Sequence, residues 1–277
     1  MKRFLSIFFV LSSILSAREP VTEAPPLRVT GSPLVGVQQV GQDASLATSL
    51  RTVPGVVVVG QGLPAGQTDL TIRGSSFSGA GLSLGGLSLR NAQTEHFHAE
   101  LPFPAGWFAR PEVLTGVSQA AETEGHLTGT VALSPLPMRN RTRVTAGLDN
   151  KDGFWAHAGA QRVRETDGGQ QGLGVFAGHA DIPGVDLPDN DIRSTRAAAR
   201  GEWTGEHGRG DLLIGHQDKS FGTRGYYGVS PRFDSEEETE DTLLFAGWRQ
   251  DDPAAPWSAS LLLRRFQDDY RLFLPSG

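Results

Sequence analysis

The chain has 277 residues, and its 35 glycines and 17 prolines argue against continuous helical packing. Five tryptophans, 14 phenylalanines and a hydrophobic fraction of 38% are too many for a disordered chain. The 25 basic and 31 acidic residues give a net charge of −6, which excludes the basic surface that nucleic-acid binding requires. The absence of cysteine excludes a disulfide scaffold, a thiolate zinc site and thiol catalysis. We therefore expect a β-rich, turn-rich protein with no nucleic-acid partner.

The first 17 residues have the order of a cleaved signal peptide. Lys2 and Arg3 precede an apolar stretch over residues 4–15, and the small residues Ser16 and Ala17 follow it. Residues 18–31 are proline-rich and are predicted to form a mobile mature N-terminus. The alternative for residues 1–17 is a buried N-terminal helix. A signal peptide on a chain without cysteine favours export to a bacterial cell envelope.

Residues 32–137 are predicted to form a compact α/β unit, because short helices and strands alternate there. Asp43 can cap a helix near residues 46–50, in which three apolar side chains share one face, and a proline–glycine pair then ends it. Four consecutive valines predict a strand over residues 56–59 that is buried on both faces. Further strands are expected over residues 70–72, 112–114 and 128–133.

Five short motifs in this unit resemble, in their order, the plug domain of TonB-dependent outer-membrane receptors. They are LRVTG (27–31), LATSLRTVPGVVVV (46–59), LTIRG (70–74), EVLTG (112–116) and TGTVALS (128–134). The resemblance implies a transporter, not an enzyme, that uses energy from the inner membrane through its partner TonB. It implies that Arg28, Val29, Thr30 and Gly31 form the segment that contacts TonB. The glycine pair 85–86 and the sequence 115–117 depart from the family pattern, which weakens assignment to a siderophore subtype.

Residues 138–277 are predicted to form the N-terminal portion of an antiparallel transmembrane β-barrel. About seven segments of roughly ten residues alternate apolar with charged side chains, and short and long connections alternate between them. Four tryptophans near the expected strand ends would form an aromatic girdle: Trp155, Trp203, Trp248 and Trp257. A soluble β-sandwich would show the same alternation. A plugged barrel has about 22 strands, so we expect a partial barrel in a fragment of a longer receptor, located in the bacterial outer membrane in contact with its lipid.

Two groups of residues are candidates for binding a ligand. His96 and His98 are expected on one face of a strand in an apical plug loop, where they would contact a substrate or, with further ligands, a metal. Arg224, Tyr226 and Tyr227 belong to a glycine-spaced aromatic outer loop that suits a large, partly flat ligand. The alternatives are a polar plug loop and a self-packed outer loop. Residues 95–100 and 221–228 resemble the apical plug loop and the aromatic outer loop of vitamin B12-type (cobalamin) receptors. This resemblance implies a corrinoid ligand, and a metal chelate such as a ferric siderophore is the next candidate.

Three further patterns have a functional and a simpler interpretation. Asp186, Asp189 and Asp191 could hold Ca²⁺ in an outer loop, although a solvated acidic loop is the favoured interpretation. The acidic run over residues 234–241 is interpreted as a solvated loop flank. Residues 81–85 (GLSLG) match the nucleophile elbow of hydrolases, but no helical pattern follows, so close strand packing or a plug apex is favoured. The alternative to an energised receptor is a passive porin-like or adhesin-type envelope protein.

Overall fold

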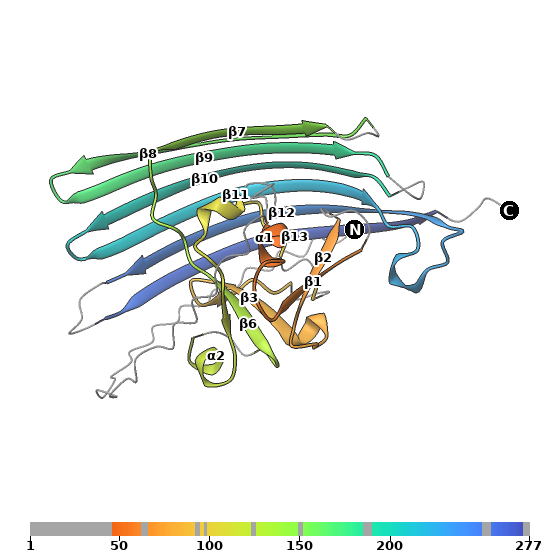
Figure 1. Cartoon of the computed structure of the whole chain (residues 1–277), viewed down its shortest axis with the longest axis horizontal. Helices are drawn as coiled ribbons and strands as arrows, with labels where there is room; N and C mark the ends of the chain where they lie inside the picture. The colour runs from red at the N-terminus through yellow and green to blue at the C-terminus, as the bar shows by residue number, and fades with distance from the viewer. Residues whose placement is uncertain are drawn as a thin grey trace.

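The computed structural model describes residues 46–61, 66–91, 95–96, 99–122, 126–148, 152–184, 190–250 and 256–273. Figure 1 shows two parts, a large curved sheet of long strands and a smaller mixed unit that packs against one face of it. The signal-peptide segment and the TonB-box segment expected at the N-terminus lie outside the described residues. In the part of the chain described, no helix is long and apolar enough to cross a membrane.

The alternating segments form one seven-stranded antiparallel sheet in which each strand pairs with the next along the chain. The number of strands agrees with the expectation, but six of them are 13 to 16 residues long, not roughly ten. Among the described residues the sheet is open, with its first and last strands at the two edges. The strands are β7 (Arg141–Leu148), β8 (Phe154–Thr166), β9 (Gly169–Ile182), β10 (Ile192–Gly205), β11 (Gly208–Gly222), β12 (Asp234–Arg249) and β13 (Ser258–Phe273).

The connections give the sheet two distinct ends. At the short-turn end, residues 167–168 and 206–207 form two-residue turns. At the long-loop end, residues 183–191 and 223–233 connect the strands. Glycine is required at the short turns, since Gly208 has φ +136° and a Cβ there would lie 2.2 Å from the carbonyl oxygen of Arg249.

The two faces of the sheet differ as a period of two dictates. One face is outward, with exposed apolar side chains such as Leu173 and Ile214, and the inward face is covered by the smaller unit. Trp203 and Trp248 face outward near the short-turn end, as expected for a girdle. Trp155 does not: it stacks on the inward-facing His157 (5.4 Å between ring centroids), so its place in the girdle was wrongly predicted.

The smaller unit contains two sheets. A two-stranded sheet pairs β1 (Val56–Gln61) with β2 (Gln67–Ile72), and a four-stranded sheet has the order β4-β3-β6-β5. Helix α1 (Leu46–Leu50) buries its three apolar residues, as its sequence predicts. The remaining elements are η1 (Phe77–Gly79), β3 (Ala80–Leu84), β4 (Leu87–Ser88), η2 (Ala105–Trp107), β5 (Glu112–Leu114), α2 (Val117–Glu122) and β6 (Gly129–Leu133).

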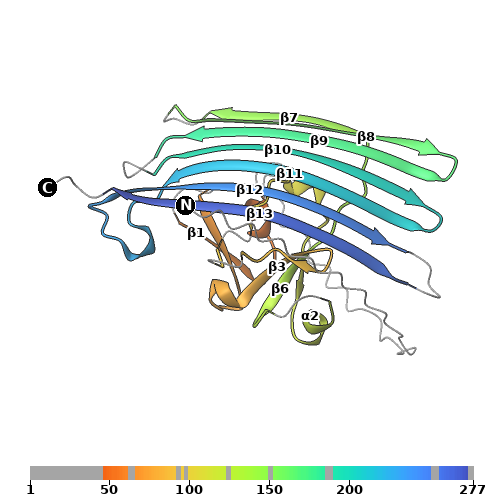
Figure 2. The same cartoon turned by 180° about the vertical axis from the view of Figure 1, so that it is seen from behind.

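One hydrophobic core joins the smaller unit to the sheet. Figure 2 shows from behind how the smaller unit lies against the sheet. Phe103 and Leu84 of the smaller unit belong to the same buried cluster as Leu213, Leu243 and Phe245 of the sheet. Gly85 lies so close to the sheet that a Cβ on it would be 2.7 Å from the Phe245 ring. The smaller unit is therefore packed against the inward face of the sheet. We call the smaller unit the plug and the seven-stranded sheet the wall.

Two further local expectations were wrong. Strand β1 is not buried on both faces, because Val57 is 55% and Val59 45% exposed on a strand that pairs only with β2. The acidic run over residues 234–241 is not a loop flank but the first half of β12. Its alternate residues Ser235, Glu237, Thr239 and Asp241 are buried on the inward face.

The glycine-rich segment over residues 81–85 forms no nucleophile elbow. It lies in β3, which turns through Gly85 and Gly86 directly into β4 and pairs in parallel with β6. An elbow needs a strand followed by a helix. Ser83 is 1% exposed. The favoured interpretation, close packing of strands, agrees with this geometry.

Candidate functional site

Aromatic rings from three separate elements meet at the long-loop end. His96 belongs to the plug, Tyr227 to η3 (Tyr226–Gly228) in the connection 223–233, and Tyr270 to β13. The ring centroids of His96 and Tyr227 are 6.3 Å apart, and those of Tyr227 and Tyr270 are 5.4 Å apart with an edge-on geometry. These three residues define what we call the apical junction. A ligand bound here touches the plug, an outer loop and the wall at once.

His96 is held in place by polar and aromatic neighbours in the plug. Its Nδ1 lies 2.9 Å and 3.1 Å from the two carboxylate oxygens of Asp69 in β2, and 2.8 Å from Nε2 of Gln67. The ring stacks on Phe77 at 4.3 Å. His96 lies outside any strand, so its predicted position on a strand face was wrong.

Tyr227 is presented by a strained loop and anchored to the wall. Its φ of 55° is in the left-handed region, which non-glycine residues rarely adopt. Its hydroxyl donates to Oε2 of Glu237 at 2.6 Å, yet 43% of the residue is exposed. Burial and then the hydrogen bond to Glu237 raise the pKa of Tyr227, and the charges of Asp268 and Asp69 add to the rise. The hydroxyl therefore stays neutral and keeps its donor proton.

The other two predicted residues of this loop serve the loop itself. Tyr226 is buried in a small cluster with Ile192 and Phe221, and its hydroxyl donates to Oδ1 of Asn190 at 3.4 Å. Burial raises the pKa of Tyr226 to about 12. Arg224 forms an ion pair with Asp234 at the start of β12. For Tyr226 and Arg224 the interpretation as a self-packed loop is the one the geometry supports.

Directly beneath the apical junction, charges of the wall hold the plug. Lys219 of β11, 4% exposed, pairs with Glu100 of the plug and donates to the carbonyl oxygen of Gly66 at 3.1 Å. Glu100 also accepts the N–H of Thr68 in β2 at 2.8 Å. Arg264 of β13 pairs with Asp241 at 2.8 Å and donates to the carbonyl oxygen of Leu89 at 2.8 Å. We call Glu100, Lys219, Asp241 and Arg264 the long-loop network.

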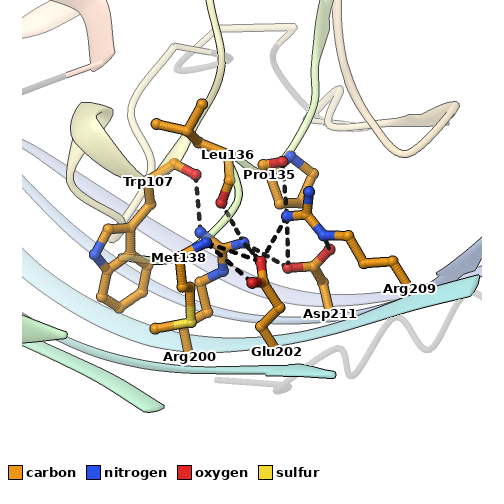
Figure 3. A network of polar contacts seen from close by, with 8 residues as sticks. All are labelled: Trp107, Pro135, Leu136, Met138, Arg200, Glu202, Arg209 and Asp211. Carbon is orange, nitrogen blue, oxygen red and sulfur yellow. Dashed lines mark hydrogen bonds and ion pairs between the residues drawn. The ribbon is translucent and has the colours of Figure 1, made fainter. Parts of the chain in front are cut away.

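A second group of charges holds the plug at the short-turn end, and we call it the short-turn network (Figure 3). Arg200 and Glu202 of β10 and Arg209 and Asp211 of β11 form ion pairs of 2.6 to 3.1 Å. All four side chains lie on the inward face of the sheet. The two arginines donate to three carbonyl oxygens on the plug side, and Glu202 accepts the N–H of Met138 at 3.0 Å. The carbonyls are those of Trp107 (3.1 Å), Leu136 (2.7 Å) and Pro135 (2.9 Å).

Most of the other predicted site residues lie outside the part of the chain that the structure describes. His98, Asp186 and Asp189 lie outside the described residues, as do Arg28, Val29, Thr30 and Gly31. Asp191 is described; its side chain is exposed and its backbone carbonyl accepts the N–H of Gly222 at 2.9 Å. Among the described residues, no three histidine or carboxylate side chains are grouped as a metal site.

Three members of this region are not among the residues predicted from the sequence. Asp69 stands immediately before the LTIRG motif, Glu237 lies within the acidic run, and Tyr270 is near the end of the last strand. The acidic run contains no alternation that singles out Glu237, because three consecutive glutamates occupy residues 236–238. No pattern in the sequence pairs Asp69 or Tyr270 with the loop.

Comparison with known proteins agrees with this architecture. Residues 36–130 match the family model described as TonB-dependent Receptor Plug Domain. The solved structure titled "Copper transporter OprC" is similar with a TM-score of 0.57 at 17% identity, over 81% of this chain and 34% of that one. The siderophore receptor PirA from Acinetobacter baumannii (TM-score 0.46, 14% identity, 83% of this chain and 43% of that one) is more weakly similar.

A ferric enterobactin receptor (PfeA) mutant from Pseudomonas aeruginosa has a TM-score of 0.45 at 14% identity, over 84% of this chain and 44% of that one. No curated protein matches the chain. The chain thus spans less than half the length of each of these three structures. The likeness to the first of them shows the same fold, a plug unit against antiparallel barrel strands.

Proposed function

We propose, on the premise that this chain carries the plug domain of TonB-dependent receptors together with strands of their barrel, that it serves energised uptake of a small molecule across the bacterial outer membrane. The ligand binds at the apical junction of His96, Tyr227 and Tyr270. TonB is the partner that supplies energy from the inner membrane. The short-turn end then faces the periplasm and the long-loop end faces the medium.

One observation carries this proposal: the plug and the wall both contribute side chains to the same surface site. His96 is fixed by Asp69 on plug strand β2, whereas Tyr227 is fixed by Glu237 on wall strand β12. A ligand between them binds to both parts, and its release requires only that one part moves relative to the other. Exposed aromatic side chains on rigid supports are typical of binding hot spots.

The charge of the apical junction favours one of the ligand classes that the sequence leaves open. Asp69, Glu237 and Asp268 are close enough to one another for their charges to act on Tyr227, and Lys219 below is already paired with Glu100. Carboxyl groups offer a polyanionic ferric chelate no positive partner, and they accept hydrogen bonds from amide groups. A neutral or cationic ligand rich in N–H groups, such as a corrinoid, therefore fits better.

The first experiment tests the ligand site. Titration calorimetry of the purified chain with cyanocobalamin, ferric enterobactin and Cu²⁺ should show binding of the corrinoid first. Replacing Tyr227 by Ala should weaken this binding at least about tenfold, because truncating an aromatic hot spot costs roughly 2 kcal/mol. Arg232→Ala in the same loop is the matched control and should leave it unchanged. Equal binding by both variants would remove the apical junction from the proposal.

The second experiment tests energy coupling. An added β-strand is the mode by which a short extended segment binds a sheet edge, and a proline in that segment removes a backbone donor. Inserting proline after Val29 should abolish cyanocobalamin uptake by cells while leaving binding at the cell surface. Uptake that survives this insertion, or that survives collapse of the proton-motive force, would support the passive porin-like alternative instead.

A further inference from the structure

The outward face of the sheet carries an apolar trough near the short-turn end. Its floor is Ala199 and Gly201 of β10. Alanine has only a methyl group and glycine has no side chain, so both residues leave a depression between the neighbouring strands. Leu173 of β9 and Leu212 of β11 stand directly opposite Gly201 and form the two walls. These residues line a cavity of about 500 Å³.

Trp203 closes the trough at the short-turn end. A Cβ on Gly201 would lie 3.0 Å from the far end of the Trp203 ring, so the ring lies against the glycine. The ring is 45% exposed, as are large parts of Leu173 and Ile214 on either side. Tryptophan at the edge of an outward apolar band is typical of the boundary between lipid tails and head groups.

Two arginines border the same trough. Arg162 lies opposite Leu173, and Arg164 lies opposite Gln171, both on the outward face of β8. Arg162 donates to the carbonyl oxygens of Arg141 (3.2 Å) and Gln161 (2.8 Å) and to Oγ1 of Thr142 (3.0 Å), and Arg164 donates to Oε1 of Gln171 (2.9 Å). Neutral acceptors therefore orient both guanidinium groups without cancelling their charge.

This arrangement differs from that of the outward arginines at the other end of the sheet. Arg193, Arg265 and Arg271 each pair with a carboxylate, on Asp181, Glu240 and Glu238 respectively. Within the described residues, neither Arg162 nor Arg164 has a carboxylate partner. Guanidinium groups bind phosphate in a bidentate manner, and basic residues at the edge of a membrane attract anionic head groups.

We propose that this trough binds one anionic phospholipid, with its phosphate between Arg162 and Arg164 and an acyl chain along Ala199 and Gly201. The inference rests on the proposed function only in that the outward face must lie in a membrane. Because the trough is at the short-turn end, the lipid belongs to the periplasmic leaflet. The apolar walls select an acyl chain, so the occupant is a lipid and not free phosphate.

The test is native mass spectrometry of the full chain in detergent micelles, titrated with dioleoyl phosphatidylglycerol. One lipid should remain bound to the wild type. The double variant Arg162→Gln/Arg164→Gln should bind it about 30-fold more weakly, since each arginine near an anionic surface contributes roughly fivefold. The control Arg193→Gln/Arg265→Gln removes the same charge from the other end of the outward face and should bind as the wild type does.

Two further measurements separate the trough from simple charge. Ala199→Leu fills the floor without touching an arginine and should also weaken lipid binding, whereas inorganic phosphate at millimolar concentration should not displace the lipid. Equal weakening in both double variants, or displacement by phosphate, would overturn the proposal. Failure of the proposed function would appear differently, as unaltered uptake in the proline-insertion variant while the lipid stays bound.

Discussion

Replacement of Arg200 by Met is the sharpest test of how the plug is held. Arg200 is 1% exposed and donates to two carbonyl oxygens on the plug side, those of Trp107 and Leu136, as well as to Glu202 and Asp211. The short-turn network contains two arginines and two carboxylates and is neutral. Methionine has a similar length but no charge and no hydrogen-bond donor. The variant therefore leaves Arg209 alone with the two carboxylates of the network. It also leaves the carbonyl oxygens of Trp107 and Leu136 without the donor that Arg200 supplied.

The magnitude follows from these losses. A buried acceptor left without a partner costs about 1–3 kcal/mol, and removing one member of a buried ion pair costs about 3–5 kcal/mol. Arg209 still neutralises one carboxylate, so the lower end of this range, about 3 kcal/mol, is expected. Because 1.4 kcal/mol is a factor of ten, local opening of the segment should become about 100-fold more frequent.

Amide hydrogen exchange measures this opening where it occurs. The N–H of Leu136 bonds to the carbonyl oxygen of Trp107 at 2.8 Å, and the N–H of Ala109 bonds to that of Ser134 at 2.8 Å. Both amides should exchange about 100-fold faster in Arg200→Met. Arg193→Met on the same strand removes an exposed arginine from a surface pair, which is worth less than about 1 kcal/mol.

A second variant restores the charge balance. Adding Asp211→Asn to Arg200→Met leaves one arginine and one carboxylate, so part of the lost protection should return. If Arg200→Met exchanges no faster than Arg193→Met, the short-turn network does not hold the plug. If the double variant is less protected than the single one, the loss is not one of charge balance.

Three further predictions use simpler measurements. Burial raises the pKa of Tyr226 to about 12, from about 10 in an unfolded chain. The contribution of the neutral phenol to the free energy of unfolding is therefore complete below pH 10 and is lost between pH 10 and 12. Urea unfolding at a series of pH values should show this decline, and Tyr226→Phe should remove the decline. Gly85→Ala should lower the free energy of unfolding by about 3 kcal/mol, because Gly85 has φ +58° and contacts Phe245. Gly74→Ala has open space around the new Cβ, so it should cost only the roughly 1–2 kcal/mol of its φ of +76°. Chemical denaturation measures both values. In single-tryptophan variants, brominated lipid should quench Trp203 but not Trp155, and equal quenching would contradict their opposite faces.

The sequence predicted the parts of the fold in which one face of an element is apolar and the other is not. The seven strands follow from that alternation, and α1 follows from three apolar residues on one helical face. The same reasoning fails at residues 234–241, because both faces of β12 are polar there. One face meets solvent, and the other meets Lys219 and Arg264 at the edge of the plug. A hydrophobic pattern cannot reveal a strand whose inward partners are charges.

Two other errors have a related cause. A run of valines indicates a strand but not how many neighbours it has, and β1 has only one, which leaves Val57 and Val59 exposed. Trp155 lies near a strand end as expected, but parity along β8 turns it inward onto His157. In both cases the residue type was informative and the face was set by tertiary packing, which a single sequence does not specify.

The two halves of the candidate site could be predicted from the sequence, but their contact could not. The histidine motif and the aromatic loop were each recognised, but their meeting depends on how the plug is seated in the wall. That seating is set by the long-loop network, in which Glu100 holds both Lys219 and the N–H of Thr68. Thr68 is adjacent to Asp69, which orients His96. Under the proposed function, we expect a ligand that draws on the charge of Asp69 to act one residue away from the bond that ties β2 to the wall. Its binding would then be coupled to the contact that must loosen before the plug can move.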